Sequence, residues 1–261
     1  MGQRPGRVVE YPVSRDPGLG ARAAEWLGST DRLVAPARPA ATVMLVRDGA
    51  PGPEVYVQRR VASMAFAPST VVFPGGGVDP ADHGLDVNTP GLAELARAMG
   101  VGVAAAAPFA AAAVREVEEE CGVRLEVRAL RGRAHWVTPE FEPRRYDTWI
   151  LAAGMPPGQH ATGTTTESDH STWVDPRELL DRHAAGSVRM LPPTVVSLEQ
   201  LASFDSAAAF LADRPTVARV LPRGGLCPGH HGGRYDRRED ALVFLKDPGQ
   251  EGLLGPCRAR P

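Results

Sequence analysis

Cysteine is scarce in this chain. Among 261 residues there are three cysteines, Cys121, Cys227 and Cys257, an odd number placed far apart in the sequence. Such a set does not make a disulfide framework and is typical of proteins whose thiols stay reduced. We therefore expect a cytoplasmic protein without structural disulfides.

Long apolar runs and targeting segments are also missing from the sequence. No apolar run approaches the roughly 20 residues needed to cross a bilayer. The opening residues MGQRPGRVVEYPV contain no apolar segment of the kind that directs secretion. Gly6 stands where a myristoylation signal has Ser or Thr. We expect a soluble protein with no membrane partner.

The chain has no excess of charge of either sign. Its formal net charge is −2 at pH 7, with 23% charged residues. Domains that bind nucleic acid usually present a basic surface, so we expect no nucleic acid partner. The hydrophobic content of 43% is ordinary for a globular protein with a buried core.

Strand and helix patterns follow one another without a clean break, which predicts a mixed α+β domain. Residues 40–49 and 54–60 alternate like the strands of a hairpin, with a turn at Gly49–Pro53. Further strands are predicted at 69–73, 124–130, 133–139, 146–153 and 240–246. Helices are predicted at 89–100, at 110–121 with Pro108 in the first turn, after Asp175, and at 192–204.

The helix within residues 110–123, AAAAVREVEEECGV, is acidic at its end. Its acids are Glu116, Glu118, Glu119 and Glu120, just before Gly122, where the helix should stop. The last turn of a helix already carries partial negative charge, which makes this an unfavourable place for acids. At helical spacing three of them, Glu116, Glu119 and Glu120, share one face. A hard divalent cation, Mg²⁺ or Mn²⁺, would offset their repulsion, whereas a solvated acidic face is the simpler alternative.

The neighbouring residues resemble a known motif. REVEEECGV, residues 115–123, resembles the second half of the Nudix box, R-E-U-x-E-E-x-G-U with U aliphatic. Upstream, VFPGGGVD resembles the Pro-Gly-Gly turn that opens the same box. By this resemblance the chain is identified as a member of the Nudix hydrolase family. The resemblance implies a Nudix fold, a mixed β-sheet sandwiched between helices (an α/β/α sandwich).

The same resemblance implies an activity and its residues. Nudix enzymes hydrolyse a pyrophosphate that links a nucleoside to another group, with Mg²⁺ or Mn²⁺. The implied metal ligands are Glu116, Glu119, Glu120 and the Gly75 carbonyl. Arg115 would fix the carboxylate of Glu116, and the general base would be Glu116 or Glu167. Arginines suit phosphates, and the substrate candidates are Arg60, Arg144 and Arg145.

The box departs from the family pattern in its length. Its acid slot holds Asp82, which lies 33 positions before Arg115. The resulting insertion, at about 83–107, leaves open whether Asp82 still reaches the metal site. A split box of this kind resembles the branch of coenzyme A diphosphatases. Arg60, Val71 and FPGG match the additional motif of that branch, whereas Ala65 and Ser69 do not.

Several alternatives remain open at this point. Coenzyme A or acyl-coenzyme A is the expected substrate, with ADP-ribose, NADH or a nucleotide sugar as the rival substrates. A non-catalytic ligand sensor is the rival class, although intact box glutamates favour an enzyme. We expect residues 1–37 to form an N-terminal arm, 38–205 the Nudix domain, and 206–261 an extension packed on it. A homodimer is not excluded by the sequence.

Overall fold

The computed structural model describes residues 28–61, 69–163, 168–215 and 217–224, the strand segments 9–12 and 241–244, and Arg22, Glu25 and Trp26 near the N-terminus. The chain divides into two compact units. Unit 1 combines Met1–Ala37, Trp136–Asp147 and Ala218–Pro261, and unit 2 combines Arg38–His135 and Thr148–Val217. The acidic helix and the cavity discussed below both belong to unit 2.

The larger sheet, whose residues belong mainly to unit 2, is mixed. Its strands are β2 (Ala37–Asp48), β3 (Pro53–Arg60), β4 (Thr70–Val72), β5 (Gly75–Gly77), β6 (Arg131–Val137), β7 (Arg145–Gly154), β8 (Ser168–Val174) and β9 (Arg189–Met190). They run in the order β6-β7-β2-β3-β4-β9, with β5 paired to β2 and β8 to β3. The predicted hairpin is confirmed, since β2 and β3 are antiparallel with Val46 opposite Val55. The β4–β9 pair is parallel.

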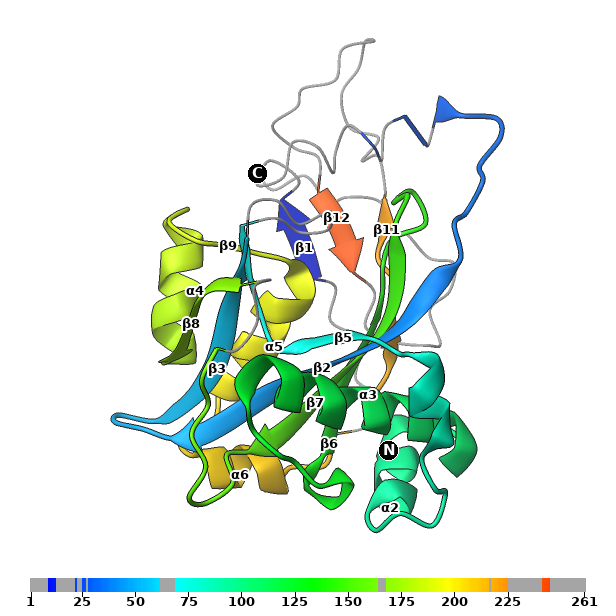
Figure 1. Ribbon diagram of the computed structural model, residues 1–261. Helices are drawn as coiled ribbons and strands as arrows, with labels where there is room; N and C mark the ends of the chain where they lie inside the picture. The colour runs from blue at the N-terminus through cyan, green and yellow to red at the C-terminus, as the bar shows by residue number, and fades with distance from the viewer. Residues whose placement is uncertain are drawn as a thin grey trace, which may run out of the picture. The chain divides into compact units, whose positions relative to one another are not determined.

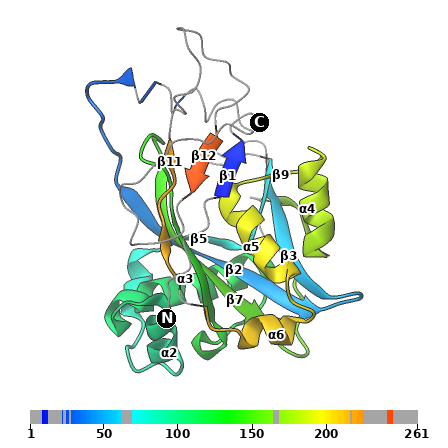
Figure 2. The same ribbon diagram turned by 180° about the vertical axis from the view of Figure 1, so that it is seen from behind.

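Helices cover both faces of this sheet (Figures 1 and 2). They are α2 (Leu92–Met99), α3 (Val103–Cys121), α4 (Pro176–Ala184), α5 (Pro192–Ala202) and α6 (Ala207–Ala212), with 3-10 turns η2 (Pro80–Gly84) and η3 (Val127–Ala129). On one face, Val43 and Leu45 of β2 pack into a core with Ala110 and Ala113 of α3. Because strand side chains alternate between faces, the buried Met44 points to the other layer. The predicted α/β/α sandwich is confirmed.

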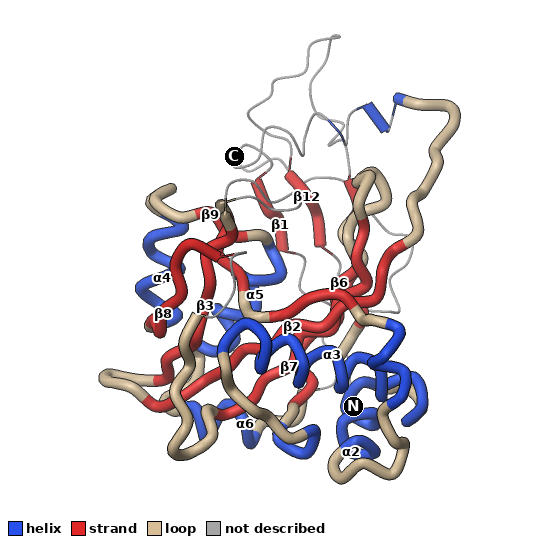
Figure 3. The backbone as a smooth tube through the Cα atoms, in the orientation of Figure 1, coloured by secondary structure: helices blue, strands red, loops and turns tan. Residues whose placement is uncertain are grey.

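Unit 1 contains a small separate sheet of segments from both ends of the chain. It has the order β1 (Val9–Pro12), β12 (Ala241–Phe244), β11 (Arg223–Gly224). Figure 3 shows β1 and β12 side by side, and their pairing is antiparallel with Val9 opposite Phe244. This confirms the strand predicted at 240–246. A further short strand, β10, spans Arg219–Val220.

The insertion folds as a helical layer. Residues 83–107 supply α2 and the first turn of α3, and Leu92, Leu95 and Met99 of α2 are buried in the α3 core. The two helices meet at 106°. Within the described residues no single helix has the length and hydropathy of a membrane span, and only this bent pair taken together has them.

Two local predictions were wrong. The strand predicted at 124–130 is an irregular segment with η3, because Leu125, Val127 and Leu130 turn into the core beside α2 and α3. Helix α3 begins at Val103, so Pro108 lies inside it and not in its first turn. The alanines before Pro108 favour helix, and Ala106 and Ala107 gain burial there.

Candidate active site

The end of α3 directs its acids unequally towards the protein. Glu120 is buried, the Glu116 side chain is 14% exposed, and that of Glu119 is 59% exposed. The helix stops at Gly122, whose φ of 66° is left-handed and whose N–H donates to the Glu118 carbonyl. This confirms the predicted helix end. Glu118 lies apart from the other acids, exposed and paired with Arg124 at 2.8 Å.

Arg115 connects most of the carboxylates at this site. Its Nη1 donates to Oε1 of Glu116 at 2.8 Å and to Oε2 of Glu119 at 3.1 Å. Its Nη2 donates to Oδ2 of Asp82 and to the Gly77 carbonyl, both at 3.0 Å, and its Nε donates to Oδ1 of Asp82 at 3.2 Å. These hydrogen bonds raise the pKa of Arg115 above its ordinary value, so it is a permanent cation. A single guanidinium therefore offsets part of the repulsion at the helix end.

The insertion does not separate Asp82 from the acidic helix. Asp82 is buried in η2, where its backbone N–H donates to the Asp79 carbonyl and its Oδ2 accepts from the Asp79 N–H at 2.8 Å. Both carboxylate oxygens also accept from Arg115, which is the bidentate arrangement that guanidinium favours. The inserted residues form α2 and the first turn of α3, and α3 then continues into the second half of the box. Asp82 thus holds the side of Arg115 that faces away from Glu116.

The glycine turn of β5 lies against α3. The Gly75 N–H donates to Oε2 of Glu120 at 2.9 Å. Gly75 has a φ of 150°, and a Cβ there would lie 2.3 Å from the Ala41 carbonyl oxygen. A Cβ on Gly76 would lie 2.3 Å from Oε1 of Glu116. The backbone approaches the carboxylates this closely only because side chains are absent.

Burial and charge shift the pKa values of two carboxyl groups in opposite directions. Burial raises the pKa of Glu116, the charges of Glu119 and Asp79 add to this, and Arg115 opposes it only in part. Burial acts in the same sense on Asp82, but hydrogen bonds from Arg115 and the Asp79 N–H outweigh it and lower its pKa. Glu116 consequently takes up a proton more readily than an exposed glutamate does.

The donor set suits a hard divalent cation. In this conformation no three His, Cys, Asp or Glu side chains of the described residues converge on one point, since Arg115 bridges Glu116 and Glu119. All the candidate side-chain ligands are nevertheless carboxylates on one helix face, beside the open backbone of Gly75. Glu119 is exposed and can change rotamer. The residues that would hold the ion are those predicted, Glu116, Glu119, Glu120 and the Gly75 carbonyl.

Comparison with known proteins agrees with this geometry. The NUDIX domain family model matches residues 98–193. A protein of Caenorhabditis elegans, "Putative nudix hydrolase 7", is 25% identical over 182 residues, which are 56% of this chain and 55% of that protein. The match thus spans about half the length of that relative. The crystal structure of a NUDIX hydrolase from Alicyclobacillus acidocaldarius is 25% identical, with a TM-score of 0.59, covering 70% of this chain and 99% of that one.

The chain contains a Nudix domain. The matched region holds the acidic end of α3 but begins after the glycine turn and Asp82. Those residues join the Nudix domain through the contacts of Gly75 with Glu120 and of Asp82 with Arg115. The fold is the Nudix fold that the sequence predicted.

The remaining predicted site residues have different surroundings. Glu167, the second candidate base, lies outside the described residues. Arg60 is half-buried at the end of β3, two residues after Gln58, whose amide donates to Sγ of Cys121 on α3. Its Nε is buried without a hydrogen-bond partner in the part of the chain that the structure describes. A buried donor of this kind suits an anionic ligand, so Arg60 stays a substrate candidate.

Arg144 and Arg145 both lie in unit 1. Arg144 is exposed. Arg145 is buried, and its guanidinium donates to the carbonyls of Thr138, Pro139 and Ala35 at 2.7–3.1 Å. These bonds tie the segment at Thr138 and Pro139 to the segment at Ala35, and we assign Arg145 that role in place of substrate binding. The sequence shows an arginine pair and carries no signal that one member is buried.

Cys121 directly follows Glu120 in the sequence. It is fully buried, and burial, together with the charge of Glu120, raises its pKa to about 12. The thiolate is the nucleophilic form, so this cysteine is inert near neutral pH. The structure agrees with its interpretation as a packing residue.

Proposed function

We propose that this protein hydrolyses the pyrophosphate bond of a nucleoside diphosphate linked to another moiety. The observation that carries the proposal is the pairing of Arg115 with Glu116 and Glu119, beside a Glu120 that accepts from the Gly75 N–H, within a Nudix domain. A solvated acidic helix face would not need a buried Glu120 bound to a glycine N–H. Nor would it need an arginine tied to a distant aspartate.

The reaction faces an electrostatic barrier, because water must attack a phosphorus atom surrounded by negative oxygens. Bound Mg²⁺ or Mn²⁺ supplies charge neutralisation and a more acidic water at such a site. The carboxylates of Glu116, Glu119 and Glu120 would hold the ions, and Arg115 orients Glu116 and Glu119. The new P–O bond forms from water while the bridging P–O bond breaks, which gives two phosphate monoesters.

The proton of the attacking water needs an acceptor. Glu116 is one candidate, and its buried, partly desolvated carboxylate is the more basic for its position. Glu167 is the other candidate that the sequence offers. Comparing Glu116→Gln with Glu167→Gln in single-turnover assays separates them. The base is the residue whose loss, at saturating Mn²⁺, lowers the rate of the chemical step and abolishes the rise of that rate with pH.

Coenzyme A or an acyl-coenzyme A is the substrate that we propose. The support is the match of Arg60, Val71 and FPGG to the motif of that branch, together with the buried Nε of Arg60. ADP-ribose, NADH and nucleotide sugars are the alternatives within the same reaction class. A ligand sensor without turnover is the alternative outside it. We also propose a cytoplasmic location.

A panel of pyrophosphates tests the proposal. Coenzyme A, acetyl-coenzyme A, ADP-ribose, NADH and a nucleotide sugar are supplied at equal concentration with Mn²⁺ or Mg²⁺, and nucleotide products are separated by chromatography. We expect the largest kcat/KM for a coenzyme A compound. A larger kcat/KM for a dinucleotide would support the proposed reaction and contradict the proposed substrate. Tight binding of a panel member with no product formed would indicate the sensor.

A further inference from the structure

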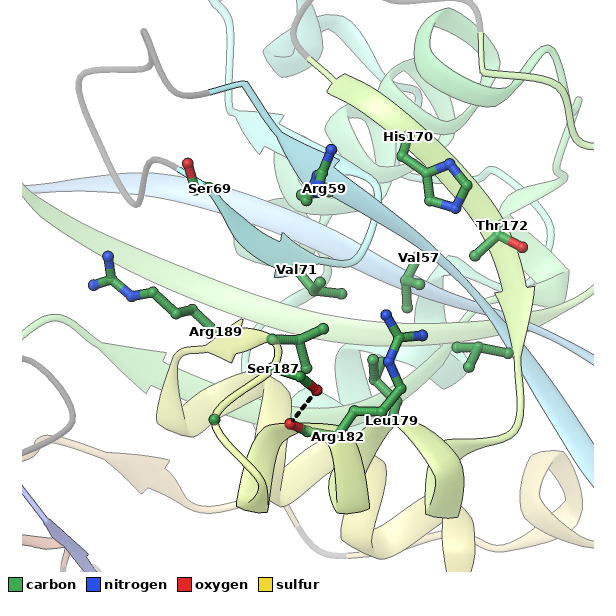
Figure 4. A pocket seen from close by; sticks show the side chains of 13 residues that line it. Val57, Arg59, Ser69, Val71, His170, Thr172, Leu179, Arg182, Ser187 and Arg189 are labelled. Carbon is green, nitrogen blue, oxygen red and sulfur yellow. Dashed lines mark hydrogen bonds between the residues drawn. The ribbon is translucent and has the colours of Figure 1, made fainter.

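A cavity of about 460 Å³ lies between the strands β3, β4 and β8 and the helix α4 (Figure 4). Figure 4 shows Val57 and Val71 between a rim of longer side chains, which includes Arg59, His170 and Arg182. Cavities of a few hundred cubic ångströms are typical of sites for small molecules. None of the roles assigned so far uses this cavity.

The cavity opens on the face of the sheet opposite to α3. Side chains alternate along β3, and Tyr56 and Gln58 point towards α3, since Tyr56 packs in its core and Gln58 donates to Cys121. Val57 and Arg59 between them therefore point the other way. The pairing of Val71 with Arg59 extends this face onto β4. The cavity is thus separated by the sheet from the Nudix glutamates.

The lining of the cavity is basic. Its charged side chains are Arg59, Arg182 and Arg189, and it contains no Asp or Glu among the described residues. One acid lies near, because Glu178 pairs with Arg182 at 3.7 Å along α4, but both side chains are about half exposed or more. A solvent-exposed pair of that kind contributes little to stability. A ligand anion can therefore replace Glu178 as the partner of Arg182.

The floor of the cavity is apolar. Val57, Val71, Val174 and Leu179 contribute it, and the arginines come from three separate elements, β3, α4 and β9. A ligand that fits both parts has an anionic group at one end and an apolar or aromatic body at the other. Guanidinium groups prefer phosphate and carboxylate, and the lining residues that the structure describes include no carboxylate to hold a metal ion.

We propose that this cavity is a metal-independent binding site for an organic phosphate. The phosphate lies among Arg59, Arg182 and Arg189, and the body of the ligand lies on the valine floor. The ligand can be the distal part of a hydrolysed substrate or a separate molecule. The binding itself does not depend on the proposed hydrolysis, because it needs neither the Nudix glutamates nor a cation.

Calorimetry of the full chain in EDTA tests this site, with AMP, inorganic pyrophosphate and adenosine as probes. We expect AMP or pyrophosphate to bind, and adenosine to bind at least about tenfold more weakly than AMP because it lacks the charged group. Arg182→Gln and Arg189→Gln should each weaken binding by about tenfold or more. Arg128→Gln removes an exposed charge from outside the cavity and should leave the affinity unchanged. All three arginines are exposed, so the variants should fold like the wild type, and melting curves check this.

Two results would overturn the proposal. One is that neither AMP nor pyrophosphate binds, and the other is that Arg182→Gln and Arg189→Gln bind them as the wild type does. The source of the ligand follows from steady-state kinetics with divalent cation. A raised KM with unchanged kcat in Arg182→Gln would show that the ligand of the cavity is part of the substrate. An unchanged KM together with weakened AMP binding identifies a separate ligand.

Discussion

Arg115 is the residue that makes a group of acids tolerable at the unfavourable end of a helix. Its planar guanidinium donates to three carboxylates and the Gly77 carbonyl in different directions. A lysine could not reproduce this, since its ammonium is a point charge without a fixed fork of donors. One cation among several carboxylates still leaves an excess of negative charge. This excess is what a divalent cation would neutralise.

Glu120→Gln tests the role of that charge. The glutamine oxygen can still accept from the Gly75 N–H, so the fold should survive, while the negative ligand is lost. We expect kcat/KM on the best pyrophosphate of the panel to fall by about 100-fold or more. Glu118→Gln is the matched control, since Glu118 is two residues away, exposed and paired with Arg124. Near-normal turnover of Glu120→Gln would show that the catalytic site lies elsewhere.

At the scale of elements, the site depends on how the β5 turn meets α3. The turn is held on one side by pairing with β2, where Gly75 is opposite Thr42, and on the other by Glu120. The two glycines differ in what surrounds them. Gly75 faces backbone, which cannot move aside, whereas Gly76 faces the end of the flexible Glu116 side chain.

Gly75→Ala and Gly76→Ala should therefore fail in different ways. Gly75→Ala combines a positive φ with contact to the Ala41 carbonyl, and we expect a loss of about 1–3 kcal/mol of stability. Gly76→Ala displaces only a carboxylate, so its melting temperature should stay close to the wild type while turnover falls. Thermal melts and kcat measured on both proteins check this. Equal melting temperatures with equal activities would refute the described packing.

The insertion adds a helix to the layer that contains α3. Its helix α2 packs on α3 through Leu92, Leu95 and Met99, and η2 keeps Asp82 against Arg115. The added residues therefore thicken one helical layer without interrupting the box. A long separation in sequence costs little here, since the cost of closing a loop grows only slowly with its length.

At the scale of the whole molecule, metal binding and folding should be linked. The native state gathers Glu116, Glu119 and Glu120 on one face, and the unfolded chain does not, so a cation that binds there stabilises the fold. We expect millimolar Mn²⁺ or Mg²⁺ to raise the melting temperature, and EDTA to reverse the rise. At about 100 times Kd the gain is roughly 2.7 kcal/mol.

The matched control for this effect is a Glu119→Gln, Glu120→Gln double variant, which should melt at the same temperature with and without the cation. A wild-type melting temperature that does not respond to either ion would contradict the assignment of the metal ligands. It would not contradict the proposed phosphate site, because that site contains no carboxylate among its described lining residues.

Much of the fold could be predicted because it follows from local pattern. The β2–β3 hairpin comes from alternation and a Gly-Pro turn, and the end of α3 comes from Gly122, whose left-handed φ suits glycine. Local rules failed where burial overrode them. The segment 124–130 alternates like a strand but turns into the core, and Pro108 is tolerated inside a helix that is buried on that side.

The sequence by itself determined the mixed α+β class and the grouping of Glu116, Glu119 and Glu120, because both arise from periodicities of a few residues. The α/β/α sandwich was predicted from the resemblance to the Nudix box. Only the tertiary structure decided that Asp82 reaches Arg115 across the insertion, that Arg145 is buried and bound to the Ala35 carbonyl, and that three arginines line one cavity. Those facts depend on which distant segments pack together. Packing of this kind is set by the collective burial of the core, and no short stretch of residues encodes it.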